Sequence, residues 1–594
     1  MTQPISPQEL MARRRRGQEL LRSPPATADR ARVGVLSTFN LALLPPLLAE
    51  ALDRAGVAVD IHLGEFGQVA LEALSPASGL HAFAPDEVVV VPAAEDLLAP
   101  LFKGALGADD PEVAAFVDER LVELRASVVA LLDQLPGATL YVVAFAGHDV
   151  PVAHVLDPVA ARRGQWAVEA LLAGIRDLGD LSARVVVVDW EWHSRALGTA
   201  AVGDDRLWYL ARMRLSPMGV AALADVCTRY VAAYRGRARK VLAVDLDDTL
   251  WGGVVGETGL SGLALGDEGI GLAFQDLQRE LLKLRAVGVL LTVCSKNDRA
   301  DIVEVFERHP GMVLGLEDFA AERINWRDKG SNLRELAAEL NLGLDAFVFL
   351  DDNPVERGWI ASSLPDVVVP DMPEDPVLRP RFLRELSLFD RLTVTDADLQ
   401  RTRSYEEQRD RGRLLIESPS IEGYLRSLRQ VATIEPVHEG SLARAAQLCQ
   451  RTSQFNLTTR RHTIANLERM MAHEDYEVYT LALADRFGDS GITGLAILAF
   501  TDGDAAIETF LLSCRVLGRR VEDLFLAFLA ARAKTRAARR LVGCRVSTSK
   551  NGQTERFYPD RGFVADGDGA FRLDLDRGGL GYPDEIALNV VSHA

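Results

Sequence analysis

Three aspartates stand within four positions of the stretch VLAVDLDDTLWGG (241–253), directly after an apolar run. Carboxylates this close repel one another unless a proton or a cation neutralises them. Asp245, Asp247 and Asp248 at the end of a strand therefore suggest a divalent-metal site with hard oxygen ligands. A solvated turn is the competing interpretation, because Asp and Gly are common in turns, and this motif alone does not decide between the two.

Three further blocks each follow a predicted strand or open a predicted helix: VLLTVCSKN (289–297), NWRDKGSNL (325–333) and FVFLDDNPVER (347–357). The carboxyl ends of parallel strands meet at one edge of a sheet, so the polar residues of these blocks should converge on the aspartates. They are Cys294, Ser295, Lys296, Asn297, Lys329, Asp351 and Asp352. Taken singly, each has an ordinary explanation as a cap, a turn or a surface charge. Four such blocks in this order favour the functional interpretation.

The chemistry that these residue types support is the transfer of a phosphoryl group. Asp245, Asp351, Asp352 and the backbone carbonyl of Asp247 can ligate Mg²⁺, which masks the repulsion between a carboxylate and a phosphate. Asp245 can then attack phosphorus, and Asp247 can act as general acid and base. The groups expected to hold the phosphate and the rest of the substrate are Thr249, Ser295, Lys296, Asn297 and Lys329.

Alternating strand-like and helix-like segments predict an α/β multidomain protein. The predicted strands are 32–37, 87–92, 139–146, 183–189, 241–246, 288–293, 346–351, 477–485, 492–500 and 505–514. The last three have the apolar pattern of antiparallel strands, and a helix is predicted at 521–538. The expected parts are an N-terminal helical or flexible segment (1–30), an α/β domain (31–236), a catalytic α/β domain (237–395), a helical connector (396–430) and an α+β domain (431–594).

Composition narrows the class of protein. The chain has 594 residues and a net charge of −19, which argues against nucleic-acid binding. No apolar run approaches the roughly 20 residues of a membrane span, and the basic start has no apolar core behind it, so neither a membrane anchor nor a signal peptide is expected. The five cysteines form no CxxC pair, which predicts a reducing cytoplasm and no structural zinc.

Together, DLDDT, CSKN, Lys329 and LDDNP resemble the haloacid-dehalogenase (HAD) superfamily of aspartate-nucleophile phosphotransferases, with a Rossmann-like catalytic domain. The longer strings DLDDTLWGGVVGE, CSKND, LDDNPVER, SQFNLTTRRHT and SCRVLGRRVED resemble the FkbH-like proteins, and this likeness covers most of the chain. Enzymes of that family take 1,3-bisphosphoglycerate, remove phosphate and load a D-glyceryl unit onto an acyl carrier protein for polyketide pathways. The resemblance implies Mg²⁺ as cofactor and the carrier's phosphopantetheine thiol as acceptor.

Such a reaction implies a thiol that captures the acyl group from the acyl phosphate. Cys294 is the first candidate, because it stands beside Ser295 and because the charge of Lys296 would lower the pKa of its thiol. Cys514 in LLSCRVLGRR is the alternative. Against Cys294, a free Cys is most often a small buried hydrophobe, and strand alternation would aim it away from Ser295.

The C-terminal part resembles the GNAT acyltransferase fold. RVLGRR (515–520) is similar to that fold's pyrophosphate and pantetheine loop, R/Q-x-x-G-x-G/A, although Arg520 departs from the final Gly or Ala. NGQTERFYPDRGF (551–563) matches its ending. The residues that this resemblance assigns to a carrier's pantetheine arm are Arg515, Gly518, Arg519, Arg520, Asn551 and Tyr558. A basic patch for an acidic carrier, or simply a solvated helix face, is predicted at Arg519, Arg520, Lys534, Arg536, Arg539 and Arg540.

The N-terminal domain is somewhat like an SGNH hydrolase, since Ser37, Thr38 and Asn40 follow its first strand. Asp189 and His193 are candidate partners, but their spacing is not Asp-x-x-His, so an SGNH-like, non-catalytic scaffold is predicted. Two other functions remain open. One is a stand-alone Mg²⁺-dependent phosphatase acting on a small phosphorylated metabolite, and the other is a non-catalytic protein that docks a carrier, which the intact set of site residues argues against.

Overall fold

The computed structural model describes residues 5–25, 29–102, 110–147, 158–392, 394, 411, 414, 418–501, 503–548, 551–567 and 569–591. Two compact units emerge, and each is described by itself: Met1–Arg235 with Ile464–Arg469, and Gly236–Thr463 with Met470–Ala594. Most of the connector predicted at 396–430 lies outside the described residues. Within the described ranges, no helix combines the length and the apolar character that crossing a membrane requires.

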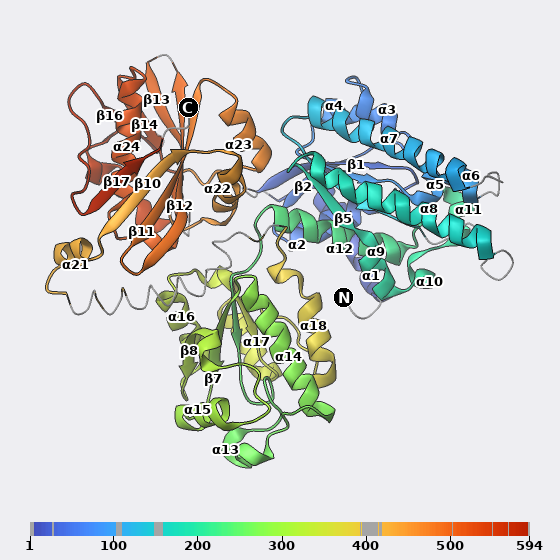
Figure 1. Cartoon of the computed structure of the whole chain (residues 1–594), viewed down its shortest axis with the longest axis horizontal. Coiled ribbons are helices and arrows are strands. Elements are labelled where there is room, and N and C mark those ends of the chain that lie inside the picture. Colours follow the sequence, from blue (N-terminus) through green and yellow to red (C-terminus); the bar gives the residue numbers. More distant parts are fainter. Residues whose placement is uncertain are drawn as a thin grey trace. The chain divides into compact units, whose positions relative to one another are not determined.

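The first unit is built on a five-stranded sheet in the order β2-β1-β3-β4-β5 (Figure 1), and all of its neighbouring strands are parallel. The strands are β1 (Arg30–Ser37), β2 (Ala58–Leu63), β3 (Glu87–Val91), β4 (Thr139–Ala144) and β5 (Val185–Asp189). The helices are α1 (Pro7–Arg22), α2 (Leu44–Arg54), α3 (Val69–Leu74), α4 (Gly79–Phe83), α5 (Ala94–Leu97), α6 (Ala99–Phe102), α7 (Asp110–Gln134), α8 (Pro158–Asp177), α9 (Trp190–Leu197), α10 (Thr199–Val202), α11 (Asp205–Ala211) and α12 (Pro217–Tyr234). Such a sheet is buried on both faces, which explains the run of four valines that follows Glu87 in β3.

Polar residues at the carboxyl edge of this sheet serve its own structure. The buried Ser37 hydroxyl accepts a hydrogen bond from a backbone N–H two residues on, at 3.2 Å. The Thr38 hydroxyl donates to Asp96 at 2.9 Å. Burial lowers the pKa of His193 to about 4, and no hydrogen bond among the described residues joins His193 or Asp189 to Ser37. The SGNH-like, non-catalytic scaffold therefore stays a prediction.

The central sheet has four parallel strands in the order β8-β7-β6-β9. They are β6 (Val241–Val244), β7 (Leu290–Ser295), β8 (Phe319–Ile324) and β9 (Phe347–Leu350). The helices are α13 (Val255–Thr258), α14 (Gly269–Ala286), α15 (Arg299–Arg308), α16 (Lys329–Glu339), α17 (Pro354–Ser363) and α18 (Arg379–Glu385). Val244 pairs with both Val293 and Leu350. This register brings the residues that follow β6, β7 and β9 to one edge.

The two faces of the central sheet are covered by different helices, because side chains alternate along each strand. Leu242 and Val244 face the core formed with α14, α15 and α18. Val241, Ala243 and Cys294 face the core formed with α16 and α17. The loops that carry the candidate site begin at the carboxyl edge of this sheet, which lies between the two cores.

The third sheet has eight strands in the order β15-β16-β14-β13-β12-β11-β10-β17. They are β10 (Gln430–Pro436), β11 (Tyr476–Asp485), β12 (Gly488–Thr501), β13 (Asp504–Leu512), β14 (Arg540–Cys544), β15 (Val564–Ala565), β16 (Ala570–Asp574) and β17 (Ile586–Val590). The helices are α21 (Ile421–Ser427), α22 (Glu439–Arg451), α23 (Ile464–Met471) and α24 (Val521–Thr535). Two of its strand pairs, β13 with β14 and β10 with β17, are parallel. Since β13 leads through α24 to β14, the domain is a mixed α/β structure.

Between β13 and β14 the sheet opens, because the two strands pair over only four residues each. Beyond that point, a segment of the SQFNLTT stretch lies along β13. The N–H of Leu457 donates to the carbonyl of Phe510 at 3.1 Å, and the N–H of Leu512 donates to the carbonyl of Phe455 at 3.0 Å. On its other side, the Leu457 carbonyl accepts from the N–H of Val546 at 2.8 Å. The chain itself therefore fills the gap between the diverging strands.

A capping aspartate sets the start of α16, the helix that begins with Lys329. The Asp328 carboxylate accepts a hydrogen bond from the N–H of Ser331 at 2.7 Å. We expect Asp328→Ala to cost about 1 kcal/mol of local stability, because an orphan donor of the first turn loses its partner. Hydrogen–deuterium exchange of peptides from α16 should then accelerate about fivefold.

Asp328→Ser is the matched control, since a serine hydroxyl accepts the same bond and should keep exchange near the native rate. Equal exchange in the Ala variant and the native protein would contradict the role of this cap.

Candidate active site

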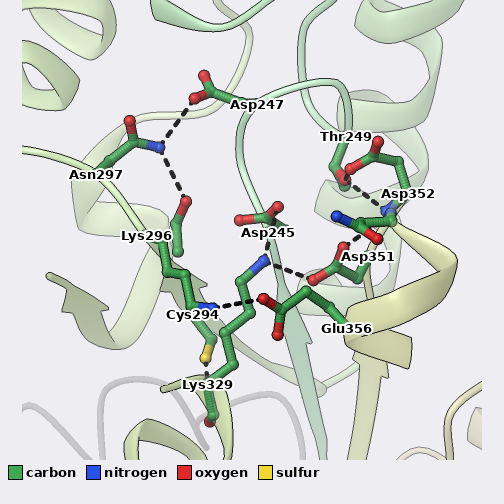
Figure 2. Close-up of polar contacts among 12 residues, drawn as sticks. Asp245, Asp247, Thr249, Cys294, Lys296, Asn297, Lys329, Asp351, Asp352 and Glu356 are labelled. Carbon is green, nitrogen blue, oxygen red and sulfur yellow. Dashed lines mark hydrogen bonds and ion pairs between the residues drawn. The ribbon is translucent and has the colours of Figure 1, made fainter. Parts of the chain in front are cut away.

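A lysine between two carboxylates forms the centre of the site (Figure 2). The Lys329 ammonium lies 2.9 Å from an Asp245 oxygen and 2.6 Å from an Asp351 oxygen. All three side chains are buried. Burial by itself lowers the pKa of the Lys329 ammonium, but the negative charges of Asp245 and Asp351 more than offset this, and the net pKa lies above its ordinary value. Lys329 therefore stays charged and holds the two carboxylates together.

Asp351 is the most strongly perturbed acid of the cluster. Burial, followed by the nearby charge of Asp245, raises its pKa to about 6, although Lys329 acts in the opposite direction. Asp352 has a raised pKa for the same first reason, burial, followed by Asp245 and Asp248. When they are ionised, the three carboxylates of Asp245, Asp351 and Asp352 exceed the one ammonium by two negative charges. A divalent cation would balance that excess.

The donor set suits a hard cation. Asp245, Asp351 and Asp352 each offer a carboxylate oxygen, and these oxygens lie within 4.8 Å of one another. The Asp245 Oδ1 atom is buried and has no hydrogen-bond partner among the described residues. A buried carboxylate oxygen without a partner is costly unless an ion or substrate meets it. Oxygen-only ligands fit Mg²⁺ or Ca²⁺ better than Zn²⁺, so the residues present fit the predicted metal.

Neighbouring groups hold the Asp351–Asp352 loop in place. The Thr249 hydroxyl accepts the N–H of Asp352 at 3.2 Å, so this predicted phosphate ligand instead links the two acidic loops. The Arg357 guanidinium donates to the carbonyls of Asp351 at 3.0 Å and of Asp352 at 2.7 Å. Sequence reasoning assigned Arg357 no role, although the quoted LDDNPVER string contains it.

Arg379 was also missed. Its buried guanidinium donates to the carbonyl of Asp248 and to the carbonyls of Pro373 and Glu374, both at 2.9 Å. Asp248 has a positive φ of 52°, so the loop after β6 turns sharply at this residue. Arg379 ties that turn to a loop more than 120 residues away, and no local sequence pattern would have revealed the contact.

Asp247 points away from the lysine and its carboxylates, toward Asn297 (Figure 2). One Asp247 oxygen accepts from the Trp251 indole N–H at 2.9 Å and from the N–H of Val255 at 3.2 Å. The other accepts from the Asn297 amide at 3.1 Å. Its carboxylate is not part of the three-carboxylate group, and the prediction that its backbone carbonyl ligates a metal stays a prediction.

The loop after β7 brings three predicted residues to the same edge. Ser295 is buried. Its hydroxyl accepts a hydrogen bond at 3.1 Å from the Asn297 amide nitrogen, the same nitrogen that donates to Asp247. The Lys296 ammonium pairs with Glu356 at the start of α17. Asn297 thus connects Ser295 to Asp247. Lys296 forms an ion pair with Glu356 and does not lie beside the thiol of Cys294.

The expectation of an accessible, activated thiol at Cys294 is wrong. The side chain is completely buried in the core against α16, and its sulfur lies 3.7 Å from the carbonyl of Lys329. Burial raises the pKa of the Cys294 thiol far more than the charge of Lys329 lowers it. The physical reason is strand alternation, which sends Cys294 and Ser295 to opposite sides of β7. Cys514, in contrast, is partly exposed.

Three of the residues assigned to a pantetheine arm are structural. Arg519 is buried and donates to Gln430 at 2.9 Å and to Asp485 at 2.6 Å. Asn551 is fully buried, and its amide donates to backbone carbonyls at 3.0 and 2.9 Å. Tyr558 packs over Gly543, where an added Cβ would lie 2.2 Å from the ring. Each of these side chains is already used inside the domain, so their assignment to a carrier's pantetheine arm stays a prediction that this burial weakens.

The start of α24 is also unlike an anion site. Gly518 and Arg520 have positive φ values of 73° and 63°, which explains why a glycine pattern is expected in this loop. Arg520 pairs with Asp523 at 3.2 Å and with Glu585 at 3.2 Å. Glu522 and Asp523 stand in the first helical turn, where they already use the favourable end of the helix dipole. A phosphate would meet two carboxylates there.

The predicted basic patch is partly neutralised within the chain. Arg540 makes a bidentate pair with Asp504 at 2.7 and 2.6 Å, and Arg536 donates to the carbonyl of Glu474 at 2.9 Å. Lys534 and Arg539 are exposed. Arg519 is buried, and Arg540 is paired with Asp504. Both facts weaken the prediction that this patch docks a carrier protein, which stays a prediction.

A solved structure with a similar fold contains a phosphatase domain. It is the N-terminal part of a Bacteroides fragilis protein in complex with Mg, with 26% sequence identity and a TM-score of 0.58. The match covers 64% of this chain, more than the central domain alone supplies, and 99% of that chain. Two further matches are a putative GNAT acetyltransferase of Desulfovibrio desulfuricans (16% identity, 24% of this chain, 99% of that chain, TM-score 0.21) and the ribosomal-protein-S18-alanine N-acetyltransferase of Escherichia coli (15%, 24%, 94%, 0.20). At those TM-scores the GNAT likeness carries no conclusion. No protein-family model and no curated protein matches the chain.

The raised pKa of Asp351 predicts that cation binding depends on pH. Because this carboxyl binds its proton more tightly in the folded protein, a proton competes with the cation below about pH 6. Calorimetric titration with MgCl₂ should give an affinity about tenfold lower at pH 5 than at pH 7, with proton release at the lower pH only. In the metal-free protein, the same proton stabilises the folded state at low pH, and that contribution is lost as the pH rises through about 6.

Asp351→Asn should bind Mg²⁺ weakly at both pH values, because it removes a ligand and the titrating group together. Equal affinity of the native protein at pH 5 and pH 7 would contradict the assignment.

Proposed function

We propose that this protein is a Mg²⁺-dependent phosphatase of the HAD type, with Asp245 as its nucleophile. The observation that carries the proposal is the buried Asp245–Lys329–Asp351 cluster at the carboxyl edge of a parallel sheet, in which Asp245 Oδ1 has no partner among the described residues. The Mg complex of the similar phosphatase domain from Bacteroides fragilis supports the choice of metal.

The steps follow from the positions of the chain's own groups. When bound by Asp245, Asp351 and Asp352, Mg²⁺ supplies the positive charge that lets a carboxylate approach a phosphate. An Asp245 oxygen forms a bond to phosphorus while the bond from phosphorus to the ester oxygen breaks. The ester oxygen leaves with the electron pair and takes a proton from Asp247. Water then attacks phosphorus, gives a proton to Asp247 and releases Asp245 and inorganic phosphate.

The finer proposal concerns the substrate. The resemblance to FkbH-like proteins supports a D-glyceryl unit from 1,3-bisphosphoglycerate that is loaded onto an acyl carrier protein. In that reaction a thiolate attacks the C1 carbonyl carbon, the carbon–oxygen bond to phosphate breaks, and phosphate leaves with the electron pair. Asp245 then serves the C3 phosphate ester. Since Cys294 is buried with a raised pKa, the thiol is Cys514 or the carrier's own phosphopantetheine thiol.

A second candidate is a stand-alone phosphatase acting on a small phosphorylated metabolite. The burial of Cys294 favours it, because the phosphoryl site has no accessible thiol beside it on β7. A non-catalytic carrier-docking protein is disfavoured, because a buried cluster of like charges is costly to maintain without a function.

The nucleophile is tested by Asp245→Asn. We expect phosphate release from 3-phosphoglycerate to fall about 10³-fold or more, because an amide does not attack phosphorus. The rate is measured as inorganic phosphate in the presence of MgCl₂, and circular dichroism reports the fold.

Asp248→Asn is the matched control. It makes the same change of charge in the same loop, but at an exposed residue outside the carboxylate group. Native activity in the Asp245 variant would refute the proposed nucleophile.

The acyl step is tested by intact-mass spectrometry after incubation with 1,3-bisphosphoglycerate, with and without a carrier protein. If Cys514 captures the acyl group, a hydroxylamine-labile adduct forms on the native protein and on Cys294→Ala but not on Cys514→Ala. Loading of the carrier without any adduct on the enzyme assigns the attack to the carrier's thiol.

An adduct that is lost in Cys294→Ala and kept in Cys514→Ala would identify Cys294 as the acyl carrier. Phosphate release without loading of the carrier would favour the stand-alone phosphatase.

A further inference from the structure

The carboxylate of Asp247 is held by three N–H donors from different parts of the central domain. Asp247 Oδ1 accepts from the Trp251 indole at 2.9 Å and from the N–H of Val255 at 3.2 Å. Asp247 Oδ2 accepts from the Asn297 amide at 3.1 Å. The first two donors belong to the turn and short helix that follow the nucleophile loop, and the third belongs to the loop after β7.

The Asn297 contacts fix the orientation of its amide. The amide nitrogen of Asn297, not its oxygen, faces Asp247 Oδ2. The same nitrogen donates to the Ser295 hydroxyl at 3.1 Å. Asn297 is 5% exposed. One buried amide therefore links the general acid to the hydroxyl that is predicted to hold the phosphate.

The Trp251 contact is equally specific. The side chain is fully buried and its ring packs edge-on against Phe306, with centroids 6.0 Å apart. A buried indole N–H needs an acceptor, and Asp247 provides it. Trp251 thus does two separable things: its ring fills the core, and its N–H fixes a catalytic carboxylate.

We propose that Trp251 and Asn297 are positioning residues for the general acid, an inference that rests on the proposed phosphatase function. Two donors occupy Asp247 Oδ1, whereas Oδ2 has one donor and keeps a lone pair for the proton. The proton on Oδ2 passes to the ester oxygen as the bond from that oxygen to phosphorus breaks. Without the two side-chain donors, only the N–H of Val255 holds the carboxylate, so its orientation loosens and its proton is misplaced.

The leaving group separates this role from a merely structural one. An alkoxide is a poor leaving group and needs the proton, whereas p-nitrophenolate leaves readily without one. Misplacing Asp247 should therefore slow the transfer of the phosphoryl group from an alkyl phosphate to Asp245 and spare its transfer from p-nitrophenyl phosphate. Both substrates depend equally on Asp245 and Lys329, so a general loss of structure would slow both.

The experiment compares kcat/KM for 3-phosphoglycerate and for p-nitrophenyl phosphate, both with MgCl₂, because kcat/KM reports phosphoryl transfer to Asp245 and excludes the later attack of water that both esters share. Trp251→Phe keeps the buried ring and removes the N–H, and we expect kcat/KM for the alkyl ester to fall about tenfold or more while kcat/KM for the aryl ester stays within about threefold. Asn297→Leu should show the same selectivity. Its KM should also rise for both esters, because Ser295 loses its donor as well.

Two controls frame the result. Asp247→Asn should give the same selectivity at larger amplitude, because it removes the acid itself. Phe306→Leu disturbs the packing of the Trp251 ring without touching its N–H, so its ratio of the two kcat/KM values should stay native.

An unchanged ratio of the two esters' kcat/KM values in Trp251→Phe, whether both values fall equally or neither falls, would overturn the positioning role. It would leave the phosphatase proposal standing. A native protein that hydrolyses neither ester would overturn the phosphatase proposal, and the positioning role with it.

Discussion

A single buried ammonium between two buried carboxylates is the interaction on which the central domain depends. Removing charges from water is costly, and two carboxylates of like sign add repulsion to that cost. Lys329 offsets both by lying 2.9 Å from Asp245 and 2.6 Å from Asp351. With Asp352 included, two negative charges remain unbalanced when all three carboxylates are ionised, and a divalent cation would balance them. Cation binding and the charge balance of the site are therefore linked.

The geometry of the sheet makes such a cluster available at little cost. Three neighbouring parallel strands end in register, so Asp245 and Asp351 reach one edge without any unusual backbone between them and the sheet. Lys329 comes from a helix start that Asp328 caps, which fixes its side chain at the same edge. In the loop after β6, Asp248 has a positive φ and Arg379 holds its carbonyl. Regular elements thus place the charges, and this short loop contains a sharp turn.

The convergence of the four motif blocks was predictable from the sequence because it follows from local rules. An apolar strand that ends in polar residues, and a capped helix start, determine which end of the sheet each group reaches. The direction of single side chains was not predictable in the same way. Cys294 and Ser295 are neighbours in sequence, yet one lies in the core and the other in the site. Strand alternation alone predicts that the two side chains point in opposite directions. The prediction of an active thiol at Cys294 came instead from the resemblance to a family with an acyl-transfer step.

Residues whose partners lie far away in sequence were the least predictable. Arg519 is buried against Gln430 and Asp485, and Arg379 reaches the carbonyl of Asp248 across more than 120 residues. A loop pattern such as RVLGRR suggests an exposed anion site, whereas the fold has already used one arginine inside. Only the glycine-like conformation at Gly518 and Arg520 follows from the local pattern, since it is a property of the backbone alone.

The separation of thiol and phosphoryl site constrains any two-step reaction. Phosphorus chemistry at Asp245 needs buried, fixed charges, because electrostatic stabilisation is strongest where water is excluded. Thioester chemistry needs a thiolate that a carbonyl carbon can reach, and burial next to carboxylates disfavours a thiolate at Cys294. The same low-polarity environment that strengthens the first reaction therefore prevents the second at this position. If the chain performs both reactions, the acyl group must be taken by a thiol that approaches from outside the core of the central domain, and only the phosphate ester approaches Lys329 and Asp245.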